Sequence, residues 1–209
     1  AYVGLFKTIS ENSIVKNLNI NIAQLLVSSN TYNSMKNGNT TPNIDLRETE
    51  LVYFGVLAGS NEGTVINVKV VNYNMLDNNN YLYVALSTGY YSVGGSQTTS
   101  TGYIGGLVGQ NTGVIADSMV GVWNNGSITA SVSTNESSKQ VRVNGFKLAG
   151  ANRVAGFVSF NAGTISNSFT SDISIVNNAT ITRNSHTAGF VGQNTGKVYS
   201  CAVTSNSIT

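Results

Sequence analysis

The feature that most constrains this chain is a repeated string, Gly-Gln-Asn-Thr-Gly, at residues 109–113 and 192–196. Related strings surround two further asparagines, so that Asn61, Asn111, Asn161 and Asn194 are spaced by 50, 50 and 33 residues. Self-similarity at a period of tens of residues is typical of repeat architectures. The sequence therefore predicts a repeat fold before any other property is considered.

Each copy of the repeat reads as a strand, a tight turn and a second strand. An apolar pair precedes the turn: Leu57-Ala58, Leu107-Val108, Phe157-Val158 and Phe190-Val191. The turn ends on Gly63, Gly113, Gly163 or Gly196, and a β-branched residue follows two positions later: Val65, Ile115, Ile165 or Val198. These apolar runs are too short for helices and rich in strand-forming residues. We expect the turn glycines to supply positive φ and to allow close backbone approach.

The repeat predicts an all-β fold, a β-solenoid (parallel β-helix) of about five coils with projecting loops. A degenerate first copy at residues 2–6 and 15–18 precedes the four well-formed ones. We expect residues 1–209 to form a single repeat domain, with coils starting near residues 2, 53, 103, 154 and 187. Stacked coils would place Ile115 between Val65 and Ile165, and would align Asn61, Asn111, Asn161 and Asn194 in a ladder of side-chain amides.

The remainder of each period is less regular. A third strand-like run lies at 44–52, 81–86 and 140–148, and the only helix candidate, 18–29, opens with an alternation that favours a strand. We interpret the polar tracts 30–43, 87–101, 124–139 and 177–186 as loops projecting from the coils. The last full period is 17 residues shorter than the others, as expected if one loop is trimmed while the coil is kept.

Composition excludes several classes of partner. Only 10% of residues are charged, against about 25% in a typical soluble domain, and the formal net charge is +2. Nucleic acid and anionic membranes need clustered Lys and Arg, so neither is expected as a partner. No apolar stretch is long enough to span a bilayer. Disorder is disfavoured because 41% of residues are hydrophobic.

The two ends of the chain lie within repeat-like sequence, without a signal peptide, a sorting tail or a capping helix. We expect the chain to be a processed product or part of a longer array, or to continue axially into a neighbour as a filament. The single cysteine, Cys201, excludes an internal disulfide.

Residues 103–118, Tyr-Ile-Gly-Gly-Leu-Val-Gly-Gln-Asn-Thr-Gly-Val-Ile-Ala-Asp-Ser, resemble the GLUG repeat, as do residues 154–168 and 188–201. The resemblance covers about 15 residues in each of four periods. GLUG repeats occur in large secreted and surface-attached microbial proteins, including adhesins and the non-catalytic parts of some IgA-cleaving peptidases. The resemblance implies an extracellular β-solenoid without catalytic residues. The long loops and the 29 asparagines depart from the compact bacterial form.

Few residues offer chemistry. His186 is the only histidine and lies in a polar tract, where we expect an exposed loop residue rather than part of a catalytic triad. One His and one Cys cannot supply a zinc site, so neither a metal nor a cofactor is expected. Cys201 occupies the register of Ser118 and Ser168, which favours a small core residue over a nucleophile.

The only acidic cluster comprises Asp45, Glu48 and Glu50, with Arg47 among them. On a strand, Glu48 and Glu50 would share a face, where they could hold a cation or serve as acid and base of a polysaccharide-cleaving β-helix. A solvated strand face is the alternative that we favour.

Four Asn-x-Ser/Thr sequons, at Asn39, Asn125, Asn135 and Asn178, fall in the tracts interpreted as loops. In a secreting eukaryote, glycans at these positions would coat the solenoid and leave its core untouched.

Together these patterns predict a non-enzymatic, extracellular or cell-surface β-solenoid with a structural or adhesive role, a building block of a surface filament or fibril. Its partners would be itself or adjacent repeats by axial coil stacking, and glycans or cell-surface ligands. The alternative is a carbohydrate-binding or carbohydrate-cleaving β-helix, in which aromatic side chains stack on sugars: Tyr81, Tyr83, Tyr90, Tyr91 and Trp123.

Overall fold

The computed structural model of the chain is all-β. It describes the following residues: 2–21, 24–28, 51–72, 81–86, 90–93, 96–99, 101–122, 132–135, 140–143, 146–150, 153–171, 173–177, 186–204 and 207–208. Across these ranges there is no helix, and four large sheets, here called A to D, contain only parallel pairs.

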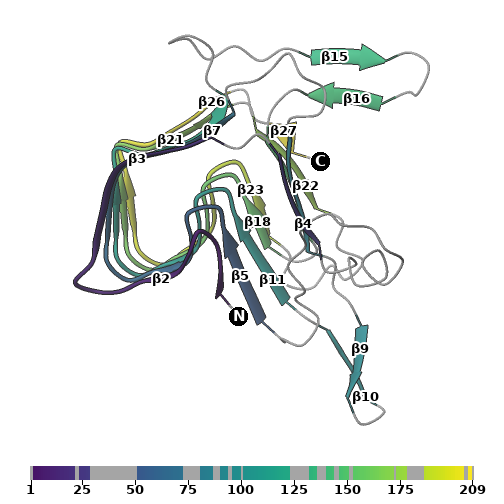
Figure 1. The fold of residues 1–209 in the computed structure, drawn as a ribbon, viewed down its shortest axis with the longest axis horizontal. Coiled ribbons are helices and arrows are strands. Elements are labelled where there is room, and N and C mark those ends of the chain that lie inside the picture. Colours follow the sequence, from purple (N-terminus) through teal and green to yellow (C-terminus); the bar gives the residue numbers. More distant parts are fainter. Residues whose placement is uncertain are drawn as a thin grey trace.

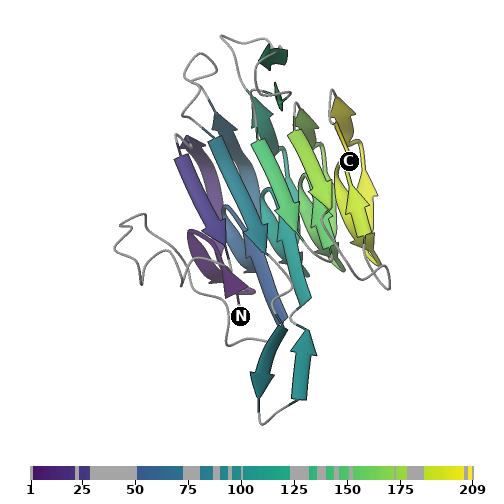
Figure 2. The same cartoon turned by 90° about the vertical axis from the view of Figure 1, so that its right-hand side faces the viewer.

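Each large sheet takes strands from five segments of the chain: segment 1 (2–28), segment 2 (51–86), segment 3 (101–150), segment 4 (153–177) and segment 5 (186–208). Strands of the same sheet lie behind one another in Figure 1 and side by side, in sequence order, in Figure 2. This arrangement is compatible with the expected parallel β-helix.

Sheets A and B precede the repeated turn and are separated by two residues in each segment, for example Val56-Leu57 in segment 2. Sheet A consists of β1 (Tyr2–Val3), β5 (Leu51–Gly55), β11 (Thr101–Gly105), β18 (Arg153–Ala155) and β23 (His186–Ala188). Sheet B consists of β2 (Phe6–Ile9), β6 (Ala58–Asn61), β12 (Val108–Asn111), β19 (Val158–Asn161) and β24 (Val191–Asn194). The two sheets form the arms of an arch that enters the molecule (Figure 1).

Sheet C follows the turn and bends at a corner in each segment. Segments 1 and 2 contribute one long strand each, β3 (Ile14–Asn21) and β7 (Thr64–Asn72). The later segments contribute two short strands each: β13 (Val114–Ala116) and β14 (Met119–Val122), β20 (Thr164–Ser166) and β21 (Phe169–Ser171), β25 (Lys197–Tyr199) and β26 (Ala202–Thr204).

Sheet D lies beside sheet A, and strands of the two sheets are in contact (Figure 1). It consists of β4 (Gln24–Ser28), β8 (Tyr81–Leu86), β17 (Phe146–Gly150), β22 (Ile173–Asn177) and β27 (Ser207–Ile208). The run 18–29 is therefore strand in its described part, as its alternation predicts.

Two antiparallel hairpins include strands in tracts that the sequence predicts as loops, whereas β16 (Gln140–Val143) falls in the predicted strand-like run 140–148. One pairs β9 (Tyr90–Val93) with β10 (Ser96–Thr99), and the other pairs β15 (Val132–Asn135) with β16 (Gln140–Val143). The loop predictions for 87–101 and 124–139 are wrong at these positions. The first hairpin has a recognisable signal, because Gly94-Gly95 separates two short runs of strand-forming residues.

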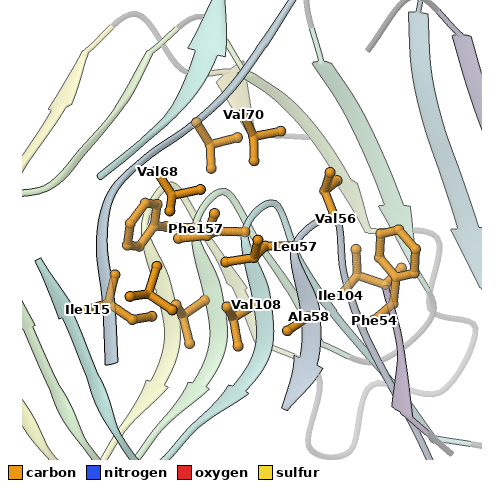
Figure 3. Packing of buried hydrophobic residues seen from close by; sticks show 14 of the residues in the cluster. Phe54, Val56, Leu57, Ala58, Val68, Val70, Ile104, Val108, Ile115 and Phe157 are labelled. Atoms are coloured by element: carbon orange, nitrogen blue, oxygen red, sulfur yellow. The ribbon is translucent and has the colours of Figure 1, made fainter. Parts of the chain in front are cut away.

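The core is built from columns, each formed by the residues that are paired in register in successive segments. Ile115 pairs with Val65 on one side and Ile165 on the other, as predicted, and all three are fully buried. Leu57 and Phe157, at the tips of the arch, reach toward Val68 and Val70 of the sheet C side (Figure 3). The arch thus brings apolar side chains into the centre of the cross-section, where they replace water contacts.

Candidate functional site

The four predicted asparagines lie at the ends of consecutive sheet B strands and are hydrogen-bonded to one another. Nδ2 of Asn61 donates to Oδ1 of Asn111, Nδ2 of Asn111 to Oδ1 of Asn161, and Nδ2 of Asn161 to Oδ1 of Asn194, each over 2.7 Å. The first three side chains are buried, whereas Asn194 is exposed. We call this chain of bonds the asparagine ladder. It has a direction, since every amide donates toward the C-terminal segment.

Each ladder asparagine also holds its own turn. Nδ2 of Asn111 donates to the carbonyl of Gly113 over 3.3 Å, and the other three make the equivalent bond to Gly63, Gly163 and Gly196. The amide therefore satisfies a carbonyl within its segment and an oxygen in the next one. Unsatisfied, these buried groups would each cost about 1–3 kcal/mol.

The turn glycines are required for space, and the prediction that they supply positive φ is wrong. Among the described glycines only Gly121 has a positive φ. A Cβ at Gly113, Gly163 or Gly196 would lie 2.1 Å from the carbonyl oxygen of the turn glycine in the preceding segment, and one at Gly63 would lie 2.4 Å from Ser10 O. Glycine is needed because the backbones of neighbouring turns approach this closely.

Left-handed backbone occurs instead at the corner of sheet C, four residues after the turn glycine in segments 2 to 5. The residues are Asn17, Asn67, Asp117, Asn167 and Ser200, with φ between 48° and 56°. Asn and Asp tolerate this conformation better than other residues with a Cβ. Nδ2 of Asn67 donates to Oδ1 of Asn17 over 2.8 Å, in the direction opposite to the asparagine ladder.

The asparagine ladder stops differently at its two ends. In segment 1 the position in register with Asn61 is Ile9, which is buried. Oδ1 of Asn61 is consequently buried without a hydrogen-bond partner among the described residues. At the other end, the exposed Asn194 donates to Gly196 within its own turn.

A tyrosine column on sheet A was not predicted. Tyr2, Tyr53 and Tyr103 are in register, with ring centroids 5.3 Å and 4.6 Å apart. Arg153 follows in the next segment, with its guanidinium carbon 4.4 Å from the Tyr103 ring centroid. Its Nη1 donates to the Tyr103 hydroxyl and, over 2.9 Å, to Oε1 of Gln193. The signal available in the sequence is Tyr at 2, 53 and 103, one residue before the aligned apolar position.

This column perturbs one titratable group. Burial raises the pKa of Tyr53 above the ordinary tyrosine value, and Tyr103 and Tyr2 raise it further, whereas Arg153 lowers it. The neutral phenol is therefore the favoured form in the folded protein.

His186 is not an exposed loop residue, contrary to the prediction. It begins β23, is half-buried, and pairs in register with Arg153. Its Nδ1 is buried and has no hydrogen-bond partner in the described part of the chain. The strand extends farther toward residue 186 than the polar residues around it suggested.

Cys201 takes the place that serine has in the two preceding segments. Oγ of Ser118 and of Ser168 donates to the carbonyl two residues earlier, over 2.8 Å and 2.7 Å. Sγ of Cys201 makes the same contact with Tyr199 O at 3.2 Å. Cys201 is half-buried and packs beside the core.

Other predicted residues are placed only in part. Asn135 is the last residue of strand β15 rather than part of a loop. Tyr81 and Tyr83 lie in β8, and Tyr90 and Tyr91 in β9. The remaining positions fall outside the described residues: Asn39, Asp45, Arg47, Glu48, Glu50, Trp123, Asn125 and Asn178.

Two kinds of feature are absent from the described residues. No group of three or more His, Cys, Asp or Glu there could hold a metal ion. Nor does that part of the chain contain a helix long and apolar enough to cross a membrane.

No family model, no curated protein and no solved structure matches this chain. The GLUG resemblance therefore depends on the repeat residues themselves, and the function must be argued from the geometry above.

Proposed function

We propose that the chain is a non-enzymatic β-solenoid of five coils that serves as an axial building block of an extracellular filament or surface fibre. The observation that carries this proposal is that the first and last segments leave core columns uncovered. Val65, Ile115 and Ile165 are fully buried, whereas Val198, which continues their column in segment 5, is 37% exposed.

The same difference recurs in other columns of segment 5. Val70, Val120 and Thr170 are fully buried, but Val203 is 48% exposed. In sheet D, Ile175 is fully buried and its partner Ile208 is 52% exposed. The uncovered side chains lie on strands that, among the described residues, have a sheet partner on one side only.

Segment 1 shows the same incomplete burial. Phe6 is 38% exposed, although the residues in register with it in the next three segments, Ala58, Val108 and Val158, are fully buried. An edge strand with free backbone groups and exposed apolar side chains is a template for further strands. Addition of another layer of strands along the stacking axis would pair the free backbone groups and bury the exposed apolar side chains.

An extracellular, structural role agrees with the low charge content and with the GLUG resemblance. Among the side chains that the structure describes, no observation favours the carbohydrate alternative. In the tyrosine column, Tyr53 stacks on Tyr2 and Tyr103, so both of its ring faces are taken. An aromatic sugar platform needs an open face.

The proposal is tested by electron microscopy and sedimentation velocity of the purified chain over a concentration series. Unbranched filaments whose mass per length corresponds to axial stacking would support a fibre-forming subunit. A chain that stays monomeric at high concentration would contradict it.

A further inference from the structure

The first and last segments that the structure describes, segments 1 and 5, match in the columns to which they contribute. Val15 and Val198 belong to one core column, and Phe6 and Val191 to another. If segment 1 of one chain lay on segment 5 of another in the register used inside the chain, apolar residues would meet apolar residues in both columns.

The corners match as well. Asn17 in segment 1 and Ser200 in segment 5 both have left-handed backbone, with φ of 56° and 53°. The internal pair Asn67–Asn17 shows that the corner amide donates toward the preceding layer. In a head-to-tail pair the Asn17 amide would therefore face the Ser200 hydroxyl.

The backbone hydrogen bonds of the turns have the polarity that such a pair requires. The N–H of Glu62 donates to Ile9 O, that of Thr112 to Asn61 O, and that of Thr195 to Asn161 O. In these turns the N–H groups thus point to the preceding layer at every internal contact. The Asn194 carbonyl is the equivalent acceptor on segment 5, and the turn at residues 10–13 would supply the donor.

One column does not match. Ile9 would lie over Asn194, so the outward amide hydrogen of Asn194 would meet an apolar side chain. Within the chain, the same isoleucine already leaves Oδ1 of Asn61 without a partner. The turn is also longer in segment 1, with four residues between Ile9 and Ile14 but two between Asn61 and Thr64.

We propose that a second copy of this chain stacks head to tail, segment 1 on segment 5, and that Ile9 breaks the asparagine ladder once per subunit. The inference depends on the proposed axial function and adds its partner, its polarity and its weak point. Two layer contacts per subunit then lack a ladder bond, the junction and the contact between segments 1 and 2, and only the junction is not also held by the continuity of the chain. Filaments dissociate there into folded subunits, because every internal contact of the later segments has an unbroken ladder.

The head-to-tail geometry is tested with a disulfide between chains. Leu18 occupies the column of Cys201, the only cysteine, and the two lie at opposite ends of one chain, so Leu18→Cys can pair with Cys201 only across a junction. Adjacent parallel strands are about 4.8 Å apart, within disulfide reach. With oxidised glutathione as the oxidant, Leu18→Cys should form covalent ladders of many subunits.

The matched control is Asn19→Cys, whose side chain lies in the neighbouring column and should cross-link far less. Equal cross-linking of the two variants, or none, would overturn the head-to-tail geometry. Covalent dimers of the unaltered chain would also overturn it, because they require two Cys201 edges to meet.

The weak point is tested with Ile9→Asn, which gives Asn61 an amide donor and Asn194 an acceptor across the junction. Satisfying these groups should lower the critical concentration for assembly about tenfold or more. Ile14→Asn is the control, since it makes the same chemical change at an exposed position outside the ladder, and it should not lower that concentration.

The outcomes separate this inference from the proposed function. Filaments of the unaltered chain that Ile9→Asn does not stabilise would leave the function standing and overturn the weak junction. A monomeric parent chain that assembles only with Ile9→Asn would support the ladder break and refute the filament function. Monomers in both cases would refute both. If Ile9→Asn does not fold, cross-linking of Leu18→Cys at several concentrations still decides whether the junction forms.

Discussion

At the scale of single residues, the repeat requires glycine at one position and a residue that tolerates left-handed backbone at another. Gly113 has no positive φ but lies against the Gly63 carbonyl. Asp117, four residues later, has left-handed backbone and an exposed side chain. A missing Cβ is needed at the first position and a tolerant backbone at the second. Two substitutions separate these roles.

Gly113→Ala should destabilise the protein by about 2 kcal/mol or more, since the new Cβ meets backbone that cannot rotate away. Asp117→Gly should change stability by less than about 1 kcal/mol, because relief of the left-handed strain offsets the extra entropy of the unfolded chain. Urea unfolding followed by circular dichroism measures both. The interpretation fails if Asp117→Gly costs as much as Gly113→Ala.

The asparagine ladder predicts a gradient of sensitivity along its length. Asn111 donates to Asn161 and accepts from Asn61, and all three side chains are buried. Asn111→Leu leaves a donor and an acceptor unpaired, which should cost about 2–4 kcal/mol in the free energy of unfolding. Asn194→Leu, at the exposed end, should cost about half as much or less. Equal losses would mean that the ladder bonds do not contribute.

At the scale of elements, the tyrosine column makes sheet A sensitive to alkaline pH. The pKa of Tyr53 is raised in the folded protein, so between the unfolded and folded pKa values the native state binds more protons. The stability present below about pH 10 should therefore fall as the pH rises through that window. Tyr53→Phe should flatten the decline above about pH 10, measured by urea unfolding at each pH.

Arg153→Met is the matched test of the same column. The guanidinium lowers the pKa of Tyr53, so its removal should raise that pKa and delay phenol ionisation in an absorbance titration. An unchanged titration would show that Arg153 and Tyr53 are not coupled in solution.

The part of the fold that the sequence predicts is the part that depends on the regular spacing of the repeats. Ile115 recurs at a fixed distance from Val65 and Ile165, so the parallel register of the core was predictable. Spacing carries no information on how the strands of each segment are arranged relative to one another. The arch of sheets A and B depends on close backbone approach, for example at Gly109, where a Cβ would lie 2.8 Å from Phe54 N. That contact joins residues of different segments, and no local pattern marks it.

The site was less predictable than the core. The ladder asparagines stand out by their spacing, but the break at Ile9 does not, because segment 1 carries a longer turn and a weaker match. His186 was misplaced because its polar neighbours resemble a loop, whereas pairing with Arg153 extends the strand to include it. In both cases, the pairing of Ile9 with Asn61 and of His186 with Arg153, contacts between distant segments and not the local sequence determine the structure.

At the scale of the whole molecule, five segments of unequal length share one cross-section. Segment 4 has the shortest link between sheets C and D, since a single residue, 172, joins Ser171 of β21 to Ile173 of β22. In segment 3, residues 123–145 stand between β14 and β17. Yet Gly121 pairs with Ser171, and Phe146 with Ile173. The insertion is accommodated without any change in the register on either side.

This equivalence predicts that residues 123–145 can be deleted. The deletion joins Val122 to Phe146 and leaves one residue between Gly121 and Phe146, as in segment 4. Leu148 then keeps its register with the buried Ile175. Cooperative thermal unfolding should be retained, with an equal or higher midpoint because a shorter loop costs less entropy to close. Deleting 123–144 instead leaves one extra residue, and a one-residue slip turns the side chains of β17 to the opposite face, so this variant should be clearly less stable. If the two deletions behave alike, the layers do not hold β17 in the register described here, and the inserted residues are part of what specifies the fold.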